Sequence, residues 1–430
     1  MNVLVFLIIV LIFIVTIGIL NEKVIHLQSD IALIMFSLII SLILLVLGRV
    51  AGIESIKKFT DNVGDFGFEE YLMDGALCFM LFAGASKVNM RKFRQNIRAI
   101  SLLALLTTVI SSVFYGLLIY LAALLFKLPL DFLSAVLLGC VVSPTDPIAA
   151  TGILNKIGLS KNVCSVIENE SLFNDGTGVT LFIFVRSLII KSSNSNFMVL
   201  MLKEIVGAFV VAIVVSFILF RLIKLTRNPI TYILVSLLDV SLSYILCEEA
   251  GFSGVIASVI CGMYFSMAMG KMESIVKVVD TRDYYEDFWE ILESLLNAAL
   301  FVMIGLLVVN IEVSRFAAII VPVSILAIVI SRAFGVFISS ILTGRKIPGN
   351  YNLFEYVTLM TWSALKGGLS LALAMSTKEF LSPDVYDIFI NVAYVTIFFT
   401  VLVQGLSVKS VYFSIEKHKA KRMALGGNRK

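Results

Sequence analysis

Long uninterrupted apolar runs constrain this chain more than any other feature. The first two are residues 1–20 and 31–50, and about 17–25 apolar residues are enough to cross a hydrocarbon core of roughly 30 Å. Hydrophobic residues make up 59% of the chain and charged residues 15%, whereas soluble chains are about half apolar and a quarter charged. The first run lacks the basic start and small-residue cleavage site of a signal peptide, so we expect a retained span.

Hydropathy and length predict an all-α polytopic membrane protein with about thirteen transmembrane helices, because a helix satisfies its own backbone in lipid. The predicted spans are 1–20, 31–50, 71–88, 98–126, 130–155, 162–190, 197–222, 230–249, 252–270, 285–310, 314–343, 354–376 and 386–411.

Charge in the connecting segments predicts the orientation. Lys and Arg gather at 87–98, 221–227, 271–282 and 345–346 and in the basic tail, whereas the segment 59–70 is acidic. The positive-inside rule places the basic segments in the cytoplasm, so we expect a cytoplasmic C-terminus and an outside N-terminus.

Composition also limits the chemistry. The five cysteines are scattered without a CxxC pair, and His26 and His418 are the two histidines in the chain. This pattern predicts neither a disulfide framework nor a resident metal. The sequence has no basic, aromatic-interleaved segment of the kind that binds nucleic acid. We expect no cofactor.

The first polar cluster interrupts the fifth predicted span. Ser143-Pro144-Thr145-Asp146-Pro147 places two prolines three residues apart in mid-span, where each removes a backbone donor and blocks helix continuation. Unwound backbone at membrane depth is tolerated against protein or a water-filled cavity. Freed carbonyls and the Asp146 carboxylate are oxygen ligands suited to a hard cation. The alternative is a plain proline kink in which Asp146 pairs with a structural base.

The second cluster lies in the sixth span. Glu170 and Asn174 are four residues apart, as are Ser171 and Asp175, so on a helix they form two adjacent stripes on one side. The span continues beyond them as pure hydrocarbon, which argues against a solvated surface helix. Ionisable residues inside a span are costly, so this face is a candidate functional site.

Two cations follow in the second half of the chain. Arg332 lies within the eleventh span, where a buried cation needs a carboxylate partner. Lys366 precedes Gly367-Gly368 in the twelfth span, which predicts a second interrupted helix. Two interrupted helices at matching places indicate inverted repeats, here spans four to six and eleven to thirteen.

Other polar residues are less informative. We expect Asp239 and Glu293 to pair across a helix interface or to line an access funnel, and we assign neither as a ligand. Trp289, with Tyr284 and Tyr285, is typical of an interfacial aromatic belt.

These motifs together resemble the monovalent cation:proton antiporters of the sodium/hydrogen exchanger type, prokaryotic sodium/proton antiporters included. The matching segments follow in order along most of the chain: Ser143–Pro147, Glu170–Gly176, Phe288–Glu290, Arg332, Trp362–Gly367 and Val403–Leu406. One position departs from the family pattern, because Lys366 stands where the family usually has arginine, and lysine lacks the forked geometry.

The resemblance implies a homodimer with two broken, crossing helices and the following division of the chain. A dimerisation or scaffold domain takes 1–90 and 230–310, 197–224 is a linking helix, the core transport domain takes 97–190 (broken helix 130–155) and 313–411 (broken helix 354–376), and 412–430 is a short basic cytoplasmic tail.

The resemblance also implies the site. Sodium and the proton bind at Asp175 and Asp146, with Thr145 and Ser171 completing the sodium ligands. Glu170 belongs to the site and pairs with Arg332, and Asn174, Ser143 and Lys366 support it. The family associates an Asn-Asp pair such as Asn174-Asp175 with electroneutral exchange.

The sequence therefore predicts a secondary antiporter, not an enzyme, that exchanges Na⁺, with Li⁺ as a further substrate, for H⁺ across the cell membrane. Alternating access would let cation and proton compete for Asp175 and Asp146. Exchange of K⁺ for H⁺ on the same fold stays open, as do the pH of activation, the stoichiometry and the direction. A remote alternative from another class is an intramembrane aspartyl protease built on the same two acids.

Overall fold

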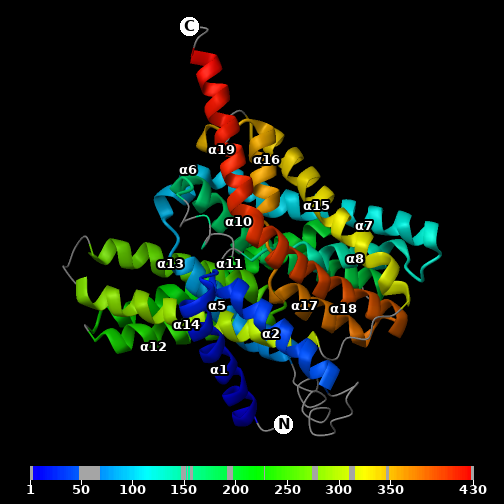
Figure 1. The fold of residues 1–430 in the computed structure, drawn as a ribbon. Helices are drawn as coiled ribbons and strands as arrows, with labels where there is room; N and C mark the ends of the chain where they lie inside the picture. Colours follow the sequence, from blue (N-terminus) through cyan, green and yellow to red (C-terminus); the bar gives the residue numbers. More distant parts are fainter. Residues whose placement is uncertain are drawn as a thin grey trace.

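The computed structural model describes residues 3–47, 68–146, 152, 154, 158–190, 197–226, 228–273, 279–308, 315–344 and 348–427, and its described elements are all helical (Figure 1). Short π- or 3-10 turns are labelled η. In chain order the elements are α1 (Val3–Leu20), η1 (Asn21–Ile25), α2 (Ser29–Leu45), α4 (Phe68–Glu70), η3 (Tyr71–Ala76), α5 (Leu77–Ser86), α6 (Met90–Ser101), η4 (Leu102–Thr107), α7 (Thr108–Phe126), α8 (Phe132–Val142), α10 (Lys161–Ile189), α11 (Phe197–Ile223), α12 (Pro229–Glu249), α13 (Gly254–Glu273), α14 (Val279–Leu307), α15 (Arg315–Thr343), η6 (Pro348–Asn350), α16 (Leu353–Trp362), α17 (Gly368–Met375), η7 (Ser376–Glu379), α18 (Pro383–Phe398), η8 (Phe399–Gln404) and α19 (Gly405–Gly427).

The helices have the length and surface of membrane spans. Eight described stretches are long and apolar enough to cross a membrane, and four shorter apolar helices accompany them. The eight are Leu7–Ile25, Met90–Phe126, Lys161–Ile189, Leu202–Ile223, Pro229–Glu249, Asp283–Leu307, Arg315–Thr343 and Pro383–Arg422. The count of about thirteen stays a prediction. The expected spans 130–155 and 354–376 are interrupted, so neither is among the eight.

Large apolar side chains cover the outer faces of these helices. Leu125 on α7, Ile218 on α11 and Ile245 on α12 are each more than half exposed. Exposing apolar area to water costs about 25 cal/mol per Å², and hydrocarbon removes that cost. The all-α membrane fold expected from the sequence is therefore confirmed.

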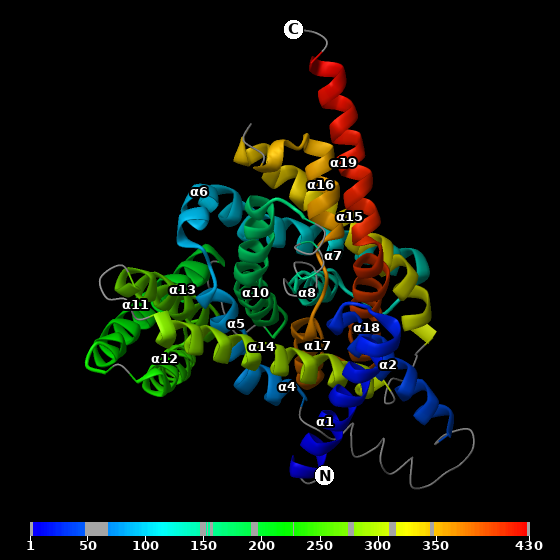
Figure 2. The ribbon, with the colours of Figure 1, turned by 60° about the vertical axis from the view of Figure 1, so that its left-hand side comes forward.

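The helices gather in two neighbouring groups. In Figure 1, α11, α12 and α13 lie together on one side with α5, and α7, α8, α15, α17 and α18 lie on the other. Helix α10 packs against members of both groups, among them α8 and α13. Helix α14 also bridges them, since it contacts α2, α5, α12 and α17 (Figure 2). Both bridging helices carry acidic residues that matter below.

The structure bears differently on the acidic segment 59–70 and on the predicted C-terminal tail. Most of the acidic segment 59–70 lies outside the described residues, as do Pro147, Arg227, Arg345 and Lys346. The tail expected from 412 begins inside α19, which continues as one helix to Gly427 (Figure 1). Between 408 and 425 there is no Gly or Pro, so nothing in the backbone ends the helix at the predicted boundary.

Candidate functional site

The first helix break lies where the two prolines predict it. Helix α8 ends at Val142, and residues 143–146 are not helical. Pro144 has no N–H to donate and disfavours the helical conformation of the residue before it. The chain beyond Asp146 lies mostly outside the described residues, so the second half of this broken helix stays a prediction.

The second break lies at the predicted glycine pair. Helix α16 ends at Trp362 and α17 begins at Gly368. The two breaks meet directly, because the Asp146 amide donates to the Leu365 carbonyl at 2.8 Å. The approach depends on glycine, since a Cβ added at Gly367 would lie 2.9 Å from Asp146 Oδ2. The contact therefore fixes the Asp146 carboxylate against the unwound segment of the second helix.

Lys366 holds the two breaks together. Its side chain is buried at 2% exposure, and Nζ donates to the Ser143 carbonyl at 2.8 Å. Its backbone amide donates to Thr400 Oγ1 at 3.1 Å. The ammonium thus satisfies a carbonyl freed where α8 ends, a role for which its single-point geometry is sufficient.

The polar face of α10 packs against the first break. Asn174 Nδ2 donates to Thr145 Oγ1 at 2.6 Å and to Glu170 Oε1 at 3.0 Å. The Thr145 amide donates to Asn174 Oδ1 at 3.2 Å, and the Thr145 and Ser171 hydroxyls are 2.8 Å apart. Since Thr145 Oγ1 accepts from Asn174, its own proton is free to go to Ser171. Asn174 thereby positions the hydroxyl next to Asp146.

A buried ion pair completes this network. Arg332 Nη2 of α15 lies 2.8 Å from Glu170 Oε2, and both side chains are almost fully buried. The two oxygens of Glu170 are thus engaged, one by Arg332 and one by Asn174. This arrangement suits Glu170 to support α10. The other two carboxylates of the predicted site belong to Asp146 and Asp175.

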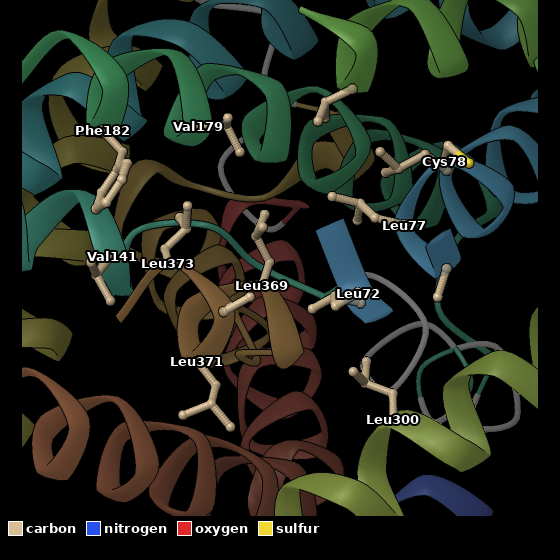
Figure 3. Packing of buried hydrophobic residues seen from close by; sticks show 14 of the residues in the cluster. Leu72, Leu77, Cys78, Val141, Val179, Phe182, Leu300, Leu369, Leu371 and Leu373 are labelled. Carbon is tan, nitrogen blue, oxygen red and sulfur yellow. The ribbon is translucent and has the colours of Figure 1, made fainter. Parts of the chain in front are cut away.

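Those carboxylates face a small cavity of about 60 Å³. Thr145, Asp146 and Asp175 contribute to its wall together with Glu293 of α14. Leu72, Leu300 and Leu369 contribute apolar parts of the same wall. Figure 3 shows these three side chains, from η3, α14 and α17, close together within the hydrophobic packing. The volume exceeds the roughly 10–15 Å³ that one water needs.

The polar groups in the cavity wall are oxygen donors. Carboxylate and hydroxyl oxygens are the ligands that hard cations prefer. Within the described part of the chain, no cluster of three or more His, Cys, Asp and Glu could hold a resident metal. Two carboxylates in a buried cavity are costly while both are charged and uncompensated. Either a hard cation or a proton bound between them would offset that cost.

The sequence did not predict that Glu293 lines the small cavity. Glu293, which the sequence left as an interface or funnel residue, forms an ion pair with Lys87, whose Nζ lies 2.7 Å from Glu293 Oε2. It also lines a wider cavity of about 860 Å³. The two residues are far apart in sequence, so no spacing within one helix indicates their contact.

The prediction of an interfacial aromatic belt is wrong for Trp289 and Tyr285. Trp289 and Tyr285 are buried at 0% and 3% exposure, whereas Tyr284 is exposed. Trp289 Nε1 donates to Ser236 Oγ at 3.0 Å, and its ring packs on Phe82 with the centroids 4.4 Å apart. Tertiary packing satisfies the indole N–H here, where an interfacial position would leave it to lipid headgroups or water.

Comparisons with known proteins agree with this architecture. Residues 63–413 match the sequence model of the family described as "Sodium/hydrogen exchanger, transmembrane". The chain is 29% identical over 407 residues to the Na(+)/H(+) antiporter NhaP of Pseudomonas aeruginosa, covering 90% of this chain and 91% of that protein. It is 28% identical over 350 residues to the low-affinity Na(+)/H(+) antiporter NhaS1 of Synechocystis sp., covering 80% of this chain and 64% of that relative.

Among solved structures, the sodium proton antiporter MjNhaP1 from Methanocaldococcus jannaschii superimposes with a TM-score of 0.77 at 18% identity, covering 96% of this chain and 99% of that one. This likeness shows a shared fold. The family consists of transporters, which sets aside the intramembrane protease. Because the family match extends over most of its length, the chain belongs to the sodium/hydrogen exchanger family.

Proposed function

We propose that this protein exchanges Na⁺ for H⁺ across the cell membrane, with Asp146 and Asp175 binding both. The observation that carries the proposal is the cavity that these two carboxylates share, at the point where two helix breaks meet. Broken helices that line a cavity at membrane depth are the usual position of a transported ion. The names of the relatives point to the same pair of substrates.

Competition for the two carboxylates would couple the ions. A proton on Asp175 removes the charge that attracts sodium, and a bound sodium offsets the charge that attracts the proton. Thr145 supplies a neutral oxygen in the same cavity, and Ser171 is hydrogen-bonded to it. Both substrates are cargo, and we propose that the protein uses no cofactor.

We propose a one-for-one exchange, and the ion pair beside the cavity supports it. Glu170 is neutralised by Arg332, and Asn174 brings no charge of its own. The cavity then alternates between a bound proton and a bound sodium without a change in net charge. The membrane potential, worth about 2.3 kcal/mol per charge per 100 mV, would drop out of the transport cycle.

Movement of one helix group against the other would carry the site between the two sides. We assign residues 97–190 and 313–411 to a moving core, 1–90 and 230–310 to a scaffold that forms a homodimer, and 197–224 to the link. The N-terminus lies outside and the C-terminus in the cytoplasm. The wide cavity near the α1–α2 connection then opens to the cytoplasm.

Transport in vesicles tests the proposal. Purified protein is reconstituted in liposomes that are acidic inside and contain a pH-sensitive dye, and Na⁺, Li⁺ or K⁺ is added outside while an ionophore clamps the membrane potential. We expect sodium to make the interior alkaline at a rate that does not depend on voltage. A response to potassium alone would change the substrate, voltage dependence would refute the one-for-one count, and silence toward every cation would refute the function.

Adding a methyl group at Gly367 should weaken cation binding. In Gly367→Ala the new Cβ would lie within 3.0 Å of the Asp146 side chain, and such overpacking costs about 1–3 kcal/mol. We expect the apparent KM for sodium to rise on the order of tenfold. Gly270→Ala is the matched control, since nothing lies within 4 Å of its added Cβ. Equal KM values for the two variants would contradict the contact between the breaks.

A further inference from the structure

A third carboxylate faces the cavity from the bridging helix α14. Glu293 lines the small cavity with Asp146 and Asp175, and it also lines the cavity of about 860 Å³ next to the α1–α2 connection. Its side chain is mostly buried. Figure 2 shows α14 passing from the α12 side toward α2 and α17. Glu293 therefore stands at the boundary between the two cavities.

The wall of the wide cavity carries more negative than positive charge, as a route for cations requires. Among the described residues of its wall are the carboxylates of Glu22, Asp30, Glu290 and Glu293, together with the ammonium of Lys87. Four carboxylates against one ammonium leave an excess of negative charge, and such an excess in a low-dielectric cleft focuses the field and raises the local concentration of counter-ions. This cavity should concentrate cations next to Glu293.

Asn297 adds an independent sign of a ligand. It lies four residues after Glu293, hence on the same face of α14, and it lines the wide cavity at 1% exposure. Its side-chain Oδ1 and Nδ2 have no hydrogen-bond partner among the described residues. A buried amide without partners is unfavourable unless something occupies the space beside it. A hydrated cation passing the amide would satisfy it.

Lys87 already presents a cation to this position. It follows the end of α5, its side chain is 42% exposed, and its Nζ lies 2.7 Å from Glu293 Oε2. Gly84, one turn earlier, leaves room beside the other carboxylate oxygen, since its added Cβ would lie 3.7 Å from Glu293 Oε1. The ammonium has the charge of the transported ion, but it is tethered and cannot travel.

We propose that Glu293 and Asn297 form a transit site for the transported monovalent cation, between the wide cavity and the Asp146–Asp175 site, and that Lys87 occupies the transit site when no cation is passing. The inference rests on the proposed exchange. An arriving cation displaces the ammonium, which swings toward the open cavity, and the ammonium returns once the cation has moved on. Either Lys87 or the passing cation thus neutralises the Glu293 carboxylate at every stage. This avoids an unpaired buried carboxylate, which is strongly unfavourable.

The two partners of this ion pair should then respond in opposite directions to neutralisation. Glu293→Gln removes the transit ligand, and we expect the apparent KM for sodium to rise severalfold. Lys87→Gln removes the competing cation, and we expect the apparent KM to fall severalfold. Asn297→Ala should follow Glu293→Gln, and Glu293→Asp should restore most of the affinity. A purely structural ion pair would instead be lost equally in both neutral variants and would shift KM the same way.

Exchange rates in vesicles at fixed pH, measured over a range of sodium concentrations, give KM and Vmax separately. Glu249→Gln and Lys409→Gln, at exposed positions that are not among the residues lining the two cavities, control for the loss of one charge. A higher KM in Glu293→Gln and a lower KM in Lys87→Gln, with unchanged KM in both control variants, would support the transit site. Shifts in the same direction, or unchanged KM, in an active wild-type background would overturn it while leaving the exchange itself intact. A silent wild type would instead refute the proposed function, and the transit site with it.

Discussion

Asp175→Asn is expected to abolish cation/proton exchange while leaving the protein folded. The substitution keeps the size of the side chain but removes a charge that attracts sodium and a group that carries the proton. Asp175 is buried, at 9% exposure, on the wall of the small cavity that it shares with Asp146. We expect the rate to fall on the order of a hundredfold or more, which corresponds to an increase of roughly 3 kcal/mol in the activation free energy of exchange.

The measurement is the initial rate of sodium-driven alkalinisation in vesicles. Asp384→Asn serves as the control, since Asp384 lies exposed in the first turn of α18. Gel filtration and circular dichroism should give the same profile for wild type and both variants. Exchange that survives in folded Asp175→Asn would remove Asp175 from the proposed role.

Arg332→Met should cause the largest loss of stability. The substitution leaves the Glu170 carboxylate buried without its cation, and removing one member of a buried ion pair costs about 3–5 kcal/mol. Glu170 also accepts from Asn174, which positions Thr145. The damage should therefore extend to the cation site, with lower transport as well as lower thermal stability in detergent.

The double variant Glu170→Gln with Arg332→Met separates charge from packing. A glutamine keeps an oxygen that can accept from Asn174 and leaves no buried charge. We expect thermal unfolding of the double variant to lie closer to wild type than that of Arg332→Met alone. A double variant less stable than the single one would mean that the uncompensated charge is not the cause.

Some of this architecture could be predicted from sequence for local reasons. Pro144 ends a helix by removing a donor, and Gly367-Gly368 permits a second break, so both breaks lie where the residues place them. The four-residue spacing of Glu170 and Asn174 likewise predicts one polar face on α10. Such features depend on the geometry of a single helix, which the sequence determines directly.

Other features depend on contacts between distant helices. The need of Arg332 for a carboxylate follows from its position in a span, but that Glu170 is the partner depends on how α10 packs on α15. The Lys87–Glu293 pair joins residues 206 positions apart. Trp289 shows the same limit, because an aromatic near a span end is compatible with both the membrane interface and a packed interior. Tertiary packing decides such cases, and spacing along one segment carries no information about it.

Competition between cation and proton is the central claim, and proton release on sodium binding tests it most directly. Sodium chloride is titrated into purified protein in weakly buffered detergent solution, and the heat is recorded in two buffers of different ionisation enthalpy. We predict that sodium binding to the wild type releases protons, so that the heats differ between buffers, and that Asp175→Asn releases none. Sodium binding with identical heats in both buffers would contradict the account, because cation and proton would then not share the site.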